Sequence, residues 1–410
     1  MQDTKTFPIV IVGHIDHGKS TLIGRLLYNN NSLSAEKTEE IKADVDKDNG
    51  FEFAHLIDYL EEERTRNMTI DTSQIFFNTT KRPYVIIDAP GHKELIKNMI
   101  TGSSQAEAAL LIIDVNEGIK EQTKRHSYIL KILGLKQVCV LVNKMDAIDY
   151  SAQEFDNLKS AVSELLKAVE ITPSAIIPVS AYKGDNITSP SENMDWFDGP
   201  TLTEALDNFT SSSTSGEALR FCVQDIYKRD SKPVIVGRVE AGSLKKGQQA
   251  VILPSKETVK INTIEKYLEE DKTEAWAGES IGLTLEGNPD IKRGDFLTEE
   301  MPSAHPAISK SLEANMFWMS ECKYNLNEPL LFKCATQEIK CRIETIKRLF
   351  DPAFADKPKD NLSEINLAEV AQVQIELDSE AVFDKFKEYA ETGRFVLEKK
   401  GVPVAGGIIL

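Results

Sequence analysis

The chain has 410 residues, more than one ordinary hydrophobic core accommodates, so we expect two or three domains. Hydrophobic residues make up 41% and charged residues 28%, which is typical of folded proteins and excludes a disordered chain. The formal charge of −17 disfavours binding to a long polyanion, because phosphate affinity rests mainly on Lys and Arg. No apolar run approaches the ~20 residues that span a bilayer, and the polar Met1–Phe7 does not resemble a signal peptide, so we expect a cytoplasmic protein.

The cysteines form no CxxC pair and no Cys/His cluster with metal-ligand spacing. In a reducing compartment this pattern predicts buried free thiols and no structural zinc. The residues concerned are Cys139, Cys222, Cys322, Cys334 and Cys341.

Up to about Asn208, short runs rich in Val, Ile and Leu alternate with longer amphipathic stretches. Near-continuous apolar strands between helices indicate an α/β domain with a mostly parallel sheet, covered by helices on both faces. The predicted strands are Pro8–Val12, Tyr84–Ile87, Ala109–Val115, Val138–Val142 and Ala175–Pro178, and the clearest predicted helices are Gln122–Leu133 and Ala152–Val169.

The segment Thr210–Gly216, TSSSTSG, has the composition of a flexible linker. From Leu219 onward, short alternating strands are broken by glycine-rich turns, which predicts an all-β barrel. A second break near Met301–Pro306 precedes another β-rich stretch that runs to Leu410. We therefore predict an α/β P-loop domain over 1–210, a β-barrel domain over 217–302 and a second β-barrel domain over 303–410.

The segment Gly13–Ser20 reads GHIDHGKS and fits the phosphate-loop pattern GxxxxGK[ST]. It follows a predicted strand and opens a predicted helix over Ser20–Tyr28, so its backbone amides could hold the α- and β-phosphates of a nucleotide. We expect Lys19 to reach the β- and γ-phosphates and the Ser20 hydroxyl to bind Mg²⁺. The alternative is a glycine-rich turn that matches by chance.

The segment Asp88–His92, DAPGH, ends the apolar run Tyr84–Ile87. An acidic residue at this place, beside the phosphate loop, could hold Mg²⁺ through water, and Gly91 could turn its amide towards a γ-phosphate. By itself, DxPG would be an ordinary β-turn. Its position after a strand favours the nucleotide interpretation.

The segment Asn143–Asp146, NKMD, follows one predicted strand, and Ser180–Ala181 follows another. The Asp146 carboxylate can accept hydrogen bonds from both N1–H and the 2-amino group of guanine. Adenine lacks both donors and would leave the carboxylate desolvated and unpaired. The sequence therefore predicts a guanine nucleotide.

Two further residues complete the predicted site. Thr69 lies in a charge-rich stretch between the phosphate loop and Asp88, where its hydroxyl could join the Mg²⁺ shell only with a γ-phosphate present; a strand-edge threonine is the alternative. His92 is the candidate that positions the attacking water, and a plain loop residue is the alternative. The nucleotide-binding prediction comprises Gly13, Asp16, His17, Gly18, Lys19, Ser20, Thr21, Asp88, Gly91, Asn143, Lys144, Asp146, Ser180 and Ala181, with Ser20, Thr69 and Asp88 as metal ligands.

These motifs resemble the translation-factor class of GTPases, which includes elongation factors Tu and 1-alpha, and the resemblance covers essentially the whole chain. It implies GTP or GDP and Mg²⁺ as ligands, hydrolysis involving His92, and often a monovalent cation at the residue that corresponds to Asp16. One departure is visible: Asn67–Met68 stands where the family usually has Gly-Ile before the threonine.

Within this class, the segments Phe53–Asp71 and Gln122–Ser127 are most similar to the GTPase subunit of heterodimeric sulfate adenylyltransferase. That resemblance implies a partner subunit that makes adenosine 5′-phosphosulfate from ATP and sulfate. Glu398 is acidic at a position where a basic, tRNA-binding side chain would be expected. This residue and the strand around Trp318 favour a protein partner over nucleic acid. An elongation factor that delivers aminoacyl-tRNA to the ribosome remains the alternative.

Overall fold

The structure is a computed structural model. It describes residues 6–14, 16–33, 53, 74–87, 106–135, 137–210, 217–229, 232–269, 271–287, 289–301, 305–352 and 362–410. The chain divides into two compact units, Met1–Ser211 and Ser212–Leu410. Most of the predicted linker, residues 211–216, lies outside the described ranges.

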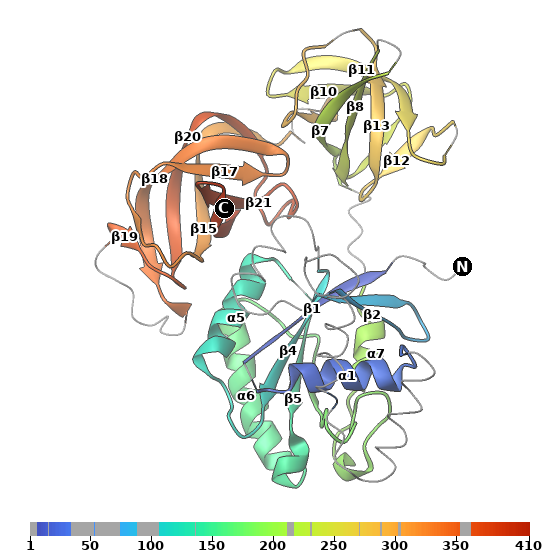
Figure 1. The fold of residues 1–410 in the computed structure, drawn as a ribbon, viewed down its shortest axis with the longest axis vertical. Coiled ribbons are helices and arrows are strands. Elements are labelled where there is room, and N and C mark those ends of the chain that lie inside the picture. Colours follow the sequence, from blue (N-terminus) through green and yellow to red (C-terminus); the bar gives the residue numbers. More distant parts are fainter. Residues whose placement is uncertain are drawn as a thin grey trace, which may run out of the picture. The chain divides into compact units, whose positions relative to one another are not determined.

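The first unit is built on a six-stranded sheet in the order β2-β3-β1-β4-β5-β6 (Figure 1). The strand β2 pairs antiparallel with β3, and the remaining neighbours are parallel. All seven residues of β4 are buried, as expected for a strand covered on both faces. The strands are β1 (Phe7–Gly13), β2 (Gln74–Asn78), β3 (Pro83–Ile87), β4 (Ala108–Asp114), β5 (Gln137–Asn143) and β6 (Ala175–Pro178).

Helices lie on both faces of this sheet (Figure 1). On one face, α1 and α7 share a core with Ile9, Leu110 and other strand residues; α5 and α6 pack together on the opposite face. A Thr201–Glu204 capping box begins α7, and the Ser151 side chain caps α6. The helices are α1 (Lys19–Asn29), α5 (Glu121–Ile132), α6 (Ala152–Ala168) and α7 (Leu202–Asp207), with short 3₁₀ turns at Met145–Ile148 and Glu192–Met194.

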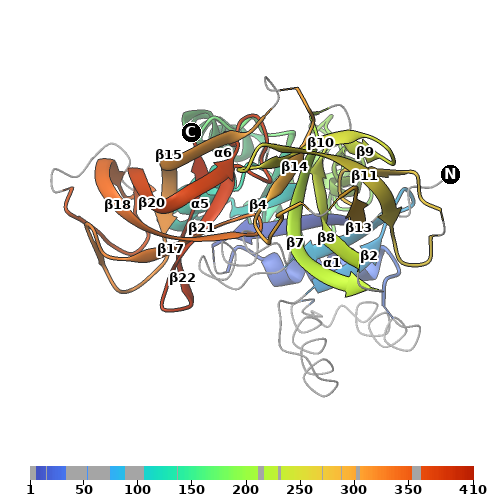
Figure 2. The same ribbon diagram turned by 90° about the horizontal axis from the view of Figure 1, so that it is seen from above.

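The second unit contains two closed β-barrels, whose curved strands are seen from above in Figure 2. The first barrel has the order β10-β11-β13-β8-β7-β14, and the second has the order β15-β20-β18-β17-β21-β22. The predicted α/β domain followed by two β-barrels is confirmed. The strands of the first barrel are β7 (Arg220–Arg229), β8 (Lys232–Ala241), β10 (Gln249–Leu253), β11 (Glu257–Glu265), β13 (Ser280–Leu285) and β14 (Phe296–Thr298), with a side pair β9 (Ser243–Lys245) and β12 (Glu274–Trp276). Those of the second are β15 (Ala307–Trp318), β17 (Leu330–Cys334), β18 (Gln337–Phe350), β20 (Val370–Phe383), β21 (Arg394–Lys399) and β22 (Val402–Ile409), with a side pair β16 (Tyr324–Asn325) and β19 (Glu364–Ile365).

A buried ion pair joins the two barrels. The guanidinium of Arg220, in β7, donates to both carboxylate oxygens of Asp384 at 2.9 and 2.8 Å, and both side chains are almost fully buried. The Thr392 hydroxyl donates to the same carboxylate at 2.5 Å, and the Tyr389 ring lies 4.1 Å from the guanidinium carbon. The pair is therefore satisfied on all sides, as a buried charge must be.

The cysteines are free thiols, as predicted, and four are buried. The prediction is wrong for Cys322, which is exposed. It lies in the turn after β15, where its carbonyl accepts a hydrogen bond from the Trp318 indole at 3.0 Å. In the described part of the chain, no helix is long and apolar enough to cross a membrane.

Candidate nucleotide-binding site

The predicted motifs meet at one edge of the first unit's sheet. The strands β1, β4, β5 and β6 are parallel neighbours, so the loops that follow them leave from their common carboxyl edge. In this register, Asp114 at the end of β4 lies opposite Asn143 at the end of β5. This edge is where open α/β sheets bind their ligands.

The phosphate loop depends on backbone conformations that few residues adopt. Gly18 has φ +92°, and a Cβ atom there would lie 2.4 Å from the Asn143 side-chain nitrogen, so both conformation and space require glycine. Asp16 is exposed and also has a positive φ, of 69°. The Lys19 ammonium lies inside the loop and donates to the carbonyls of Gly13 and His14, both at 2.8 Å. Ser20 and Thr21 follow in the first turn of α1.

Asn143 connects two loops. Its amide nitrogen donates to the His17 carbonyl at 2.9 Å, and its amide oxygen accepts from the Ala181 backbone amide, also at 2.9 Å. The side chain is buried, with 2% exposed, so both ends of the amide are satisfied by protein alone. Asn143 therefore sets the distance between the phosphate loop and the loop that begins at Ser180.

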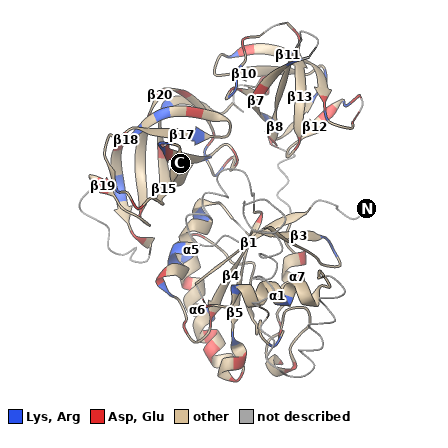
Figure 3. Ribbon diagram, in the orientation of Figure 1, with Lys and Arg blue, Asp and Glu red and all other residues tan. Residues whose placement is uncertain are grey.

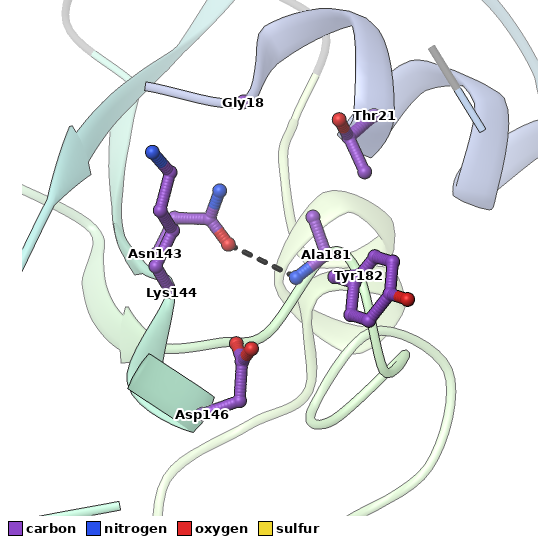
Figure 4. Close-up of a pocket in the computed structure, with 7 residues that line it drawn as sticks. All are labelled: Gly18, Thr21, Asn143, Lys144, Asp146, Ala181 and Tyr182. Atoms are coloured by element: carbon purple, nitrogen blue, oxygen red, sulfur yellow. Dashed lines mark hydrogen bonds between the residues drawn. The ribbon is translucent and has the colours of Figure 1, made fainter. Parts of the chain in front are cut away.

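A cavity of about 400 Å³ opens between these loops (Figure 4). The Ser180 hydroxyl donates to the Asp146 carboxylate at 2.5 Å and accepts from the Lys183 amide at 3.0 Å, which fixes the carboxylate at the cavity's edge. A carboxylate held in this way can accept two N–H donors from a planar base, as the guanine hypothesis requires. The cavity is lined by Gly18, Thr21, Asn143, Lys144, Asp146, Ala181 and Tyr182.

Lys144 is held by an acid from the neighbouring strand. Its ammonium lies 2.7 Å from the carboxylate of Asp114, which is 4% exposed, whereas the Lys144 side chain is 39% exposed. Burial by itself would raise the pKa of Asp114, but the hydrogen bonds from Lys144 and the Asn116 amide outweigh it and hold the pKa below its usual range. The ion pair keeps Lys144, which has φ +65°, at the wall of the cavity.

His17 has its imidazole fully buried beneath the phosphate loop. Its Nδ1 lies 3.2 Å from the Ile112 carbonyl, which can only accept, so Nδ1 carries the proton. Burial lowers the pKa of His17, and its Nε2 lies 3.4 Å from the Glu117 carboxylate without forming a hydrogen bond. The imidazole therefore packs against the sheet. The His17 carbonyl, by contrast, accepts the hydrogen bond that joins the phosphate loop to Asn143.

The structure brings together Gly13, Asp16, His17, Gly18, Lys19, Ser20, Thr21, Asn143, Lys144, Asp146, Ser180 and Ala181. Thr69, Asp88, Gly91 and His92 lie outside the described residues, so their predicted roles stay predictions.

Sequence reasoning missed three residues of this region. Tyr182 lines the cavity, Asp114 holds Lys144, and Arg25 of α1 donates to the carbonyls of Ala181 and Tyr182. Asp114 could have been identified from the sequence, because it ends an apolar run just as Asp88 does. No local pattern identifies Arg25, since its hydrogen-bond partners lie more than 150 positions away in the chain.

Three family models match the chain in order. The family described as elongation factor Tu GTP binding domain matches residues 4–212, elongation factor Tu domain 2 matches 233–298, and the GTP-eEF1A C-terminal domain-like family matches 311–410. Elongation factor 1-alpha of Methanocaldococcus jannaschii is 36% identical over 416 residues, covering 98% of this chain and 96% of the relative. That of Thermoplasma acidophilum is 36% identical, with 97% and 96% covered. A solved structure of sup35 with GDP matches 99% of this chain and 94% of that chain, at 21% identity and a TM-score of 0.45.

The prediction that the chain is a sulfate adenylyltransferase subunit with a catalytic partner is wrong, because curated relatives that match nearly the whole chain are elongation factors 1-alpha. The structure also removes the charge argument behind that prediction. Glu398, in β21, is only 12% exposed and lies 3.0 Å from the Lys333 ammonium of β17, so its charge is neutralised within the barrel. Trp318 is 1% exposed and packs in the core against Tyr324, so it marks no partner surface.

Proposed function

The chain belongs to the family of GTP-binding proteins that includes elongation factors Tu and 1-alpha, and from this premise we propose that it is a GTP-hydrolysing elongation factor that carries aminoacyl-tRNA. The observation that carries the proposal is the match to elongation factors 1-alpha along both the GTP-binding unit and the two barrels. The domain borders that we propose are those predicted above, 1–210, 217–302 and 303–410.

The cavity geometry supports guanine as the base. Asp146 is the hydrogen-bond acceptor for the N1–H and 2-amino groups, and Ser180 holds its carboxylate in place. Lys19 and the phosphate-loop amides receive the phosphates at the start of α1. The arrangement orients the nucleotide from both ends, because Asn143 ties the two loops together.

The donor set of the proposed Mg²⁺ site suits a hard cation. Ser20 is an exposed residue in the first turn of α1, beside Lys19, and its hydroxyl and the side chains of the other proposed ligands, Thr69 and Asp88, all offer oxygen. When bound, Mg²⁺ would neutralise charge on the β- and γ-phosphates. We propose that His92 orients the attacking water and that Asp16 is the contact for a monovalent cation.

The first barrel offers a place for the end of a tRNA. A pocket of about 590 Å³ is lined by residues that include Val234, Glu265 and Tyr267, and the Tyr267 side chain is 88% exposed. An exposed ring beside a pocket suits stacking of an unpaired base, the usual way in which proteins hold single-stranded ends. Basic and acidic residues both occur on the two barrels (Figure 3). Stacking acts on the face of a base rather than on a phosphate, so a contact of this kind does not by itself require a basic surface.

The direct test is protection of aminoacyl-tRNA from spontaneous deacylation by the full chain. We expect protection with GTP and Mg²⁺, and much weaker protection with GDP. Protein that binds GTP but leaves the deacylation rate unchanged would overturn the proposed carrier role. His92→Ala tests hydrolysis separately: we expect nearly unchanged nucleotide affinity and turnover lower by orders of magnitude.

A further inference from the structure

Arg25 lies on the phosphate-loop helix but reaches the loop at the other end of the cavity. It stands in α1, six residues after Lys19, and only 8% of it is exposed. Its Nε donates to the Ala181 carbonyl at 3.1 Å, and its second terminal nitrogen donates to the Tyr182 carbonyl. Both carbonyls belong to residues that line the cavity.

The Phe53 ring covers one face of the guanidinium group. Its carbon lies 3.8 Å from the centre of the Phe53 ring, and Phe53 is 1% exposed. A Cβ atom on Gly24 would lie 2.2 Å from the Phe53 carbonyl, so the glycine before Arg25 is what lets Phe53 come this close to the helix. On the loop side, Gly184 would place a Cβ atom 3.5 Å from the guanidinium carbon, which is ordinary contact.

Burying this cation carries a cost that ordinary helix packing would avoid. Burial lowers the pKa of Arg25 to about 10, while Tyr28, Asp185 and Tyr182 favour its charged form. The side chain therefore stays protonated at neutral pH and keeps its planar set of donors. Lysine, a point charge, cannot supply the same fork to two successive carbonyls.

We propose that Arg25 is a positioning residue for base selection: it fixes the Ala181–Tyr182 side of the cavity relative to the phosphate loop. Asn143 joins the same loops from β5, so the base-contacting loop is held from two directions. This inference rests on the proposed guanine-nucleotide binding. It predicts that loss of Arg25 weakens the part of the affinity that depends on the base and spares the part that depends on the phosphates.

The experiment compares Arg25→Met and Arg25→Lys with wild-type full chain. Dissociation of GDP carrying a fluorescent methylanthraniloyl group is followed by stopped flow, and GDP and ADP affinities are measured by competition. For Arg25→Met we expect GDP to dissociate roughly tenfold faster, corresponding to about 1.4 kcal/mol. We expect the ADP affinity to stay within about twofold, so the preference for GDP falls. Arg25→Lys should recover part of the loss.

The matched control is Asn29→Ala. Asn29 lies one turn further along α1 and donates to the Thr188 hydroxyl at 3.2 Å, also bridging the helix to the region after β6, but at an exposed place. We expect unchanged GDP dissociation. If Arg25→Met fails to fold, Phe53→Leu removes the ring beneath the guanidinium and should shift GDP dissociation in the same direction by a smaller factor.

A parallel loss of GDP and ADP affinity in Arg25→Met would overturn the inference, because it would show a general structural role. Unchanged GDP dissociation in folded Arg25→Met would overturn it as well. Wild-type protein that binds no GDP would instead overturn the proposed function, so the two failures are distinguishable.

Discussion

Asn143 accepts a hydrogen bond from the Ala181 backbone amide at 2.9 Å, so the end of β5 is fastened to the loop that follows β6. The same side chain donates to the His17 carbonyl in the phosphate loop. A single buried amide thus joins the two loops that flank the cavity. Its two hydrogen bonds give the motif NKMD a structural role besides its proposed contact with the base.

Asn143→Ala should weaken GDP and GTP binding together. It leaves the His17 carbonyl and the Ala181 amide without their partner, at a cost of about 1–3 kcal/mol. This corresponds to roughly fivefold to 150-fold in the dissociation constant, measurable by fluorescent-GDP titration. Asn193→Ala, whose side chain makes an exposed 3.5 Å contact with Asp185, is the control. Equal affinities for Asn143→Ala and wild type would contradict this role.

Asp146→Asn should change which base is bound. The amide can accept from N1–H and donate to the 2-oxo group of xanthine, but it meets the 2-amino group of guanine with too few acceptors. We expect hydrolysis of GTP to fall and that of xanthosine triphosphate to rise, both measured as phosphate release. If the variant still prefers GTP, Asp146 does not read the base.

The ion pair between Asp114 and Lys144 predicts an acid dependence. Because the pKa of Asp114 is lower in the folded chain than in the unfolded one, the pair stabilises the fold above the unfolded pKa of about 3.9. That contribution is lost as pH falls through the lower, folded value. The melting temperature of the full chain should thus be higher for wild type than for Asp114→Asn. We expect this difference to be constant above about pH 5 and to narrow below about pH 4. A pH-independent gap would contradict this assignment.

Tyr267→Ala tests the barrel pocket, and Tyr267 is not among the residues that line the nucleotide cavity. Removing a stacking ring typically costs about 1–3 kcal/mol per base, so GTP-dependent protection of aminoacyl-tRNA should require roughly fivefold to 150-fold more protein. Nucleotide affinity should not change. Tyr227→Ala, a tyrosine of the same barrel with 58% of its side chain exposed and not among the pocket residues, is the matched control. Unaltered protection in Tyr267→Ala would place the tRNA end elsewhere.

Asp384→Ala should loosen the second unit. It leaves the Arg220 charge buried and unpaired, and breaking such a pair typically costs about 3–5 kcal/mol. Urea unfolding of the full chain should therefore begin at a lower concentration. Glu286→Ala breaks the exposed pair with Lys260, at 2.6 Å, and should cost no more than about 1 kcal/mol. Similar shifts for both variants would show that the buried pair has no special weight.

Residue order alone determined the elements and the kind of site. Short continuous apolar runs rich in Val and Leu, such as Val138–Val142, favour strands buried on both faces, and the alternating pattern after Leu219 indicates barrels. The phosphate loop and NKMD could be found because their backbone and side-chain chemistry acts within a few neighbouring residues. Short sequence motifs therefore predict the conformation of the residues within them.

Tertiary structure decided which side chains meet. Arg25 holds a loop that follows β6, Asp114 holds Lys144 across two strands, and Lys333 neutralises Glu398 across another strand pair. The predicted partner is wrong partly for this reason, since that prediction places the Glu398 charge at a nucleic-acid contact, whereas Lys333 pairs it within the barrel. Burial and pairing depend on register and packing between distant segments, and the electrostatic meaning of a charged residue is set by those neighbours rather than by its place in the sequence.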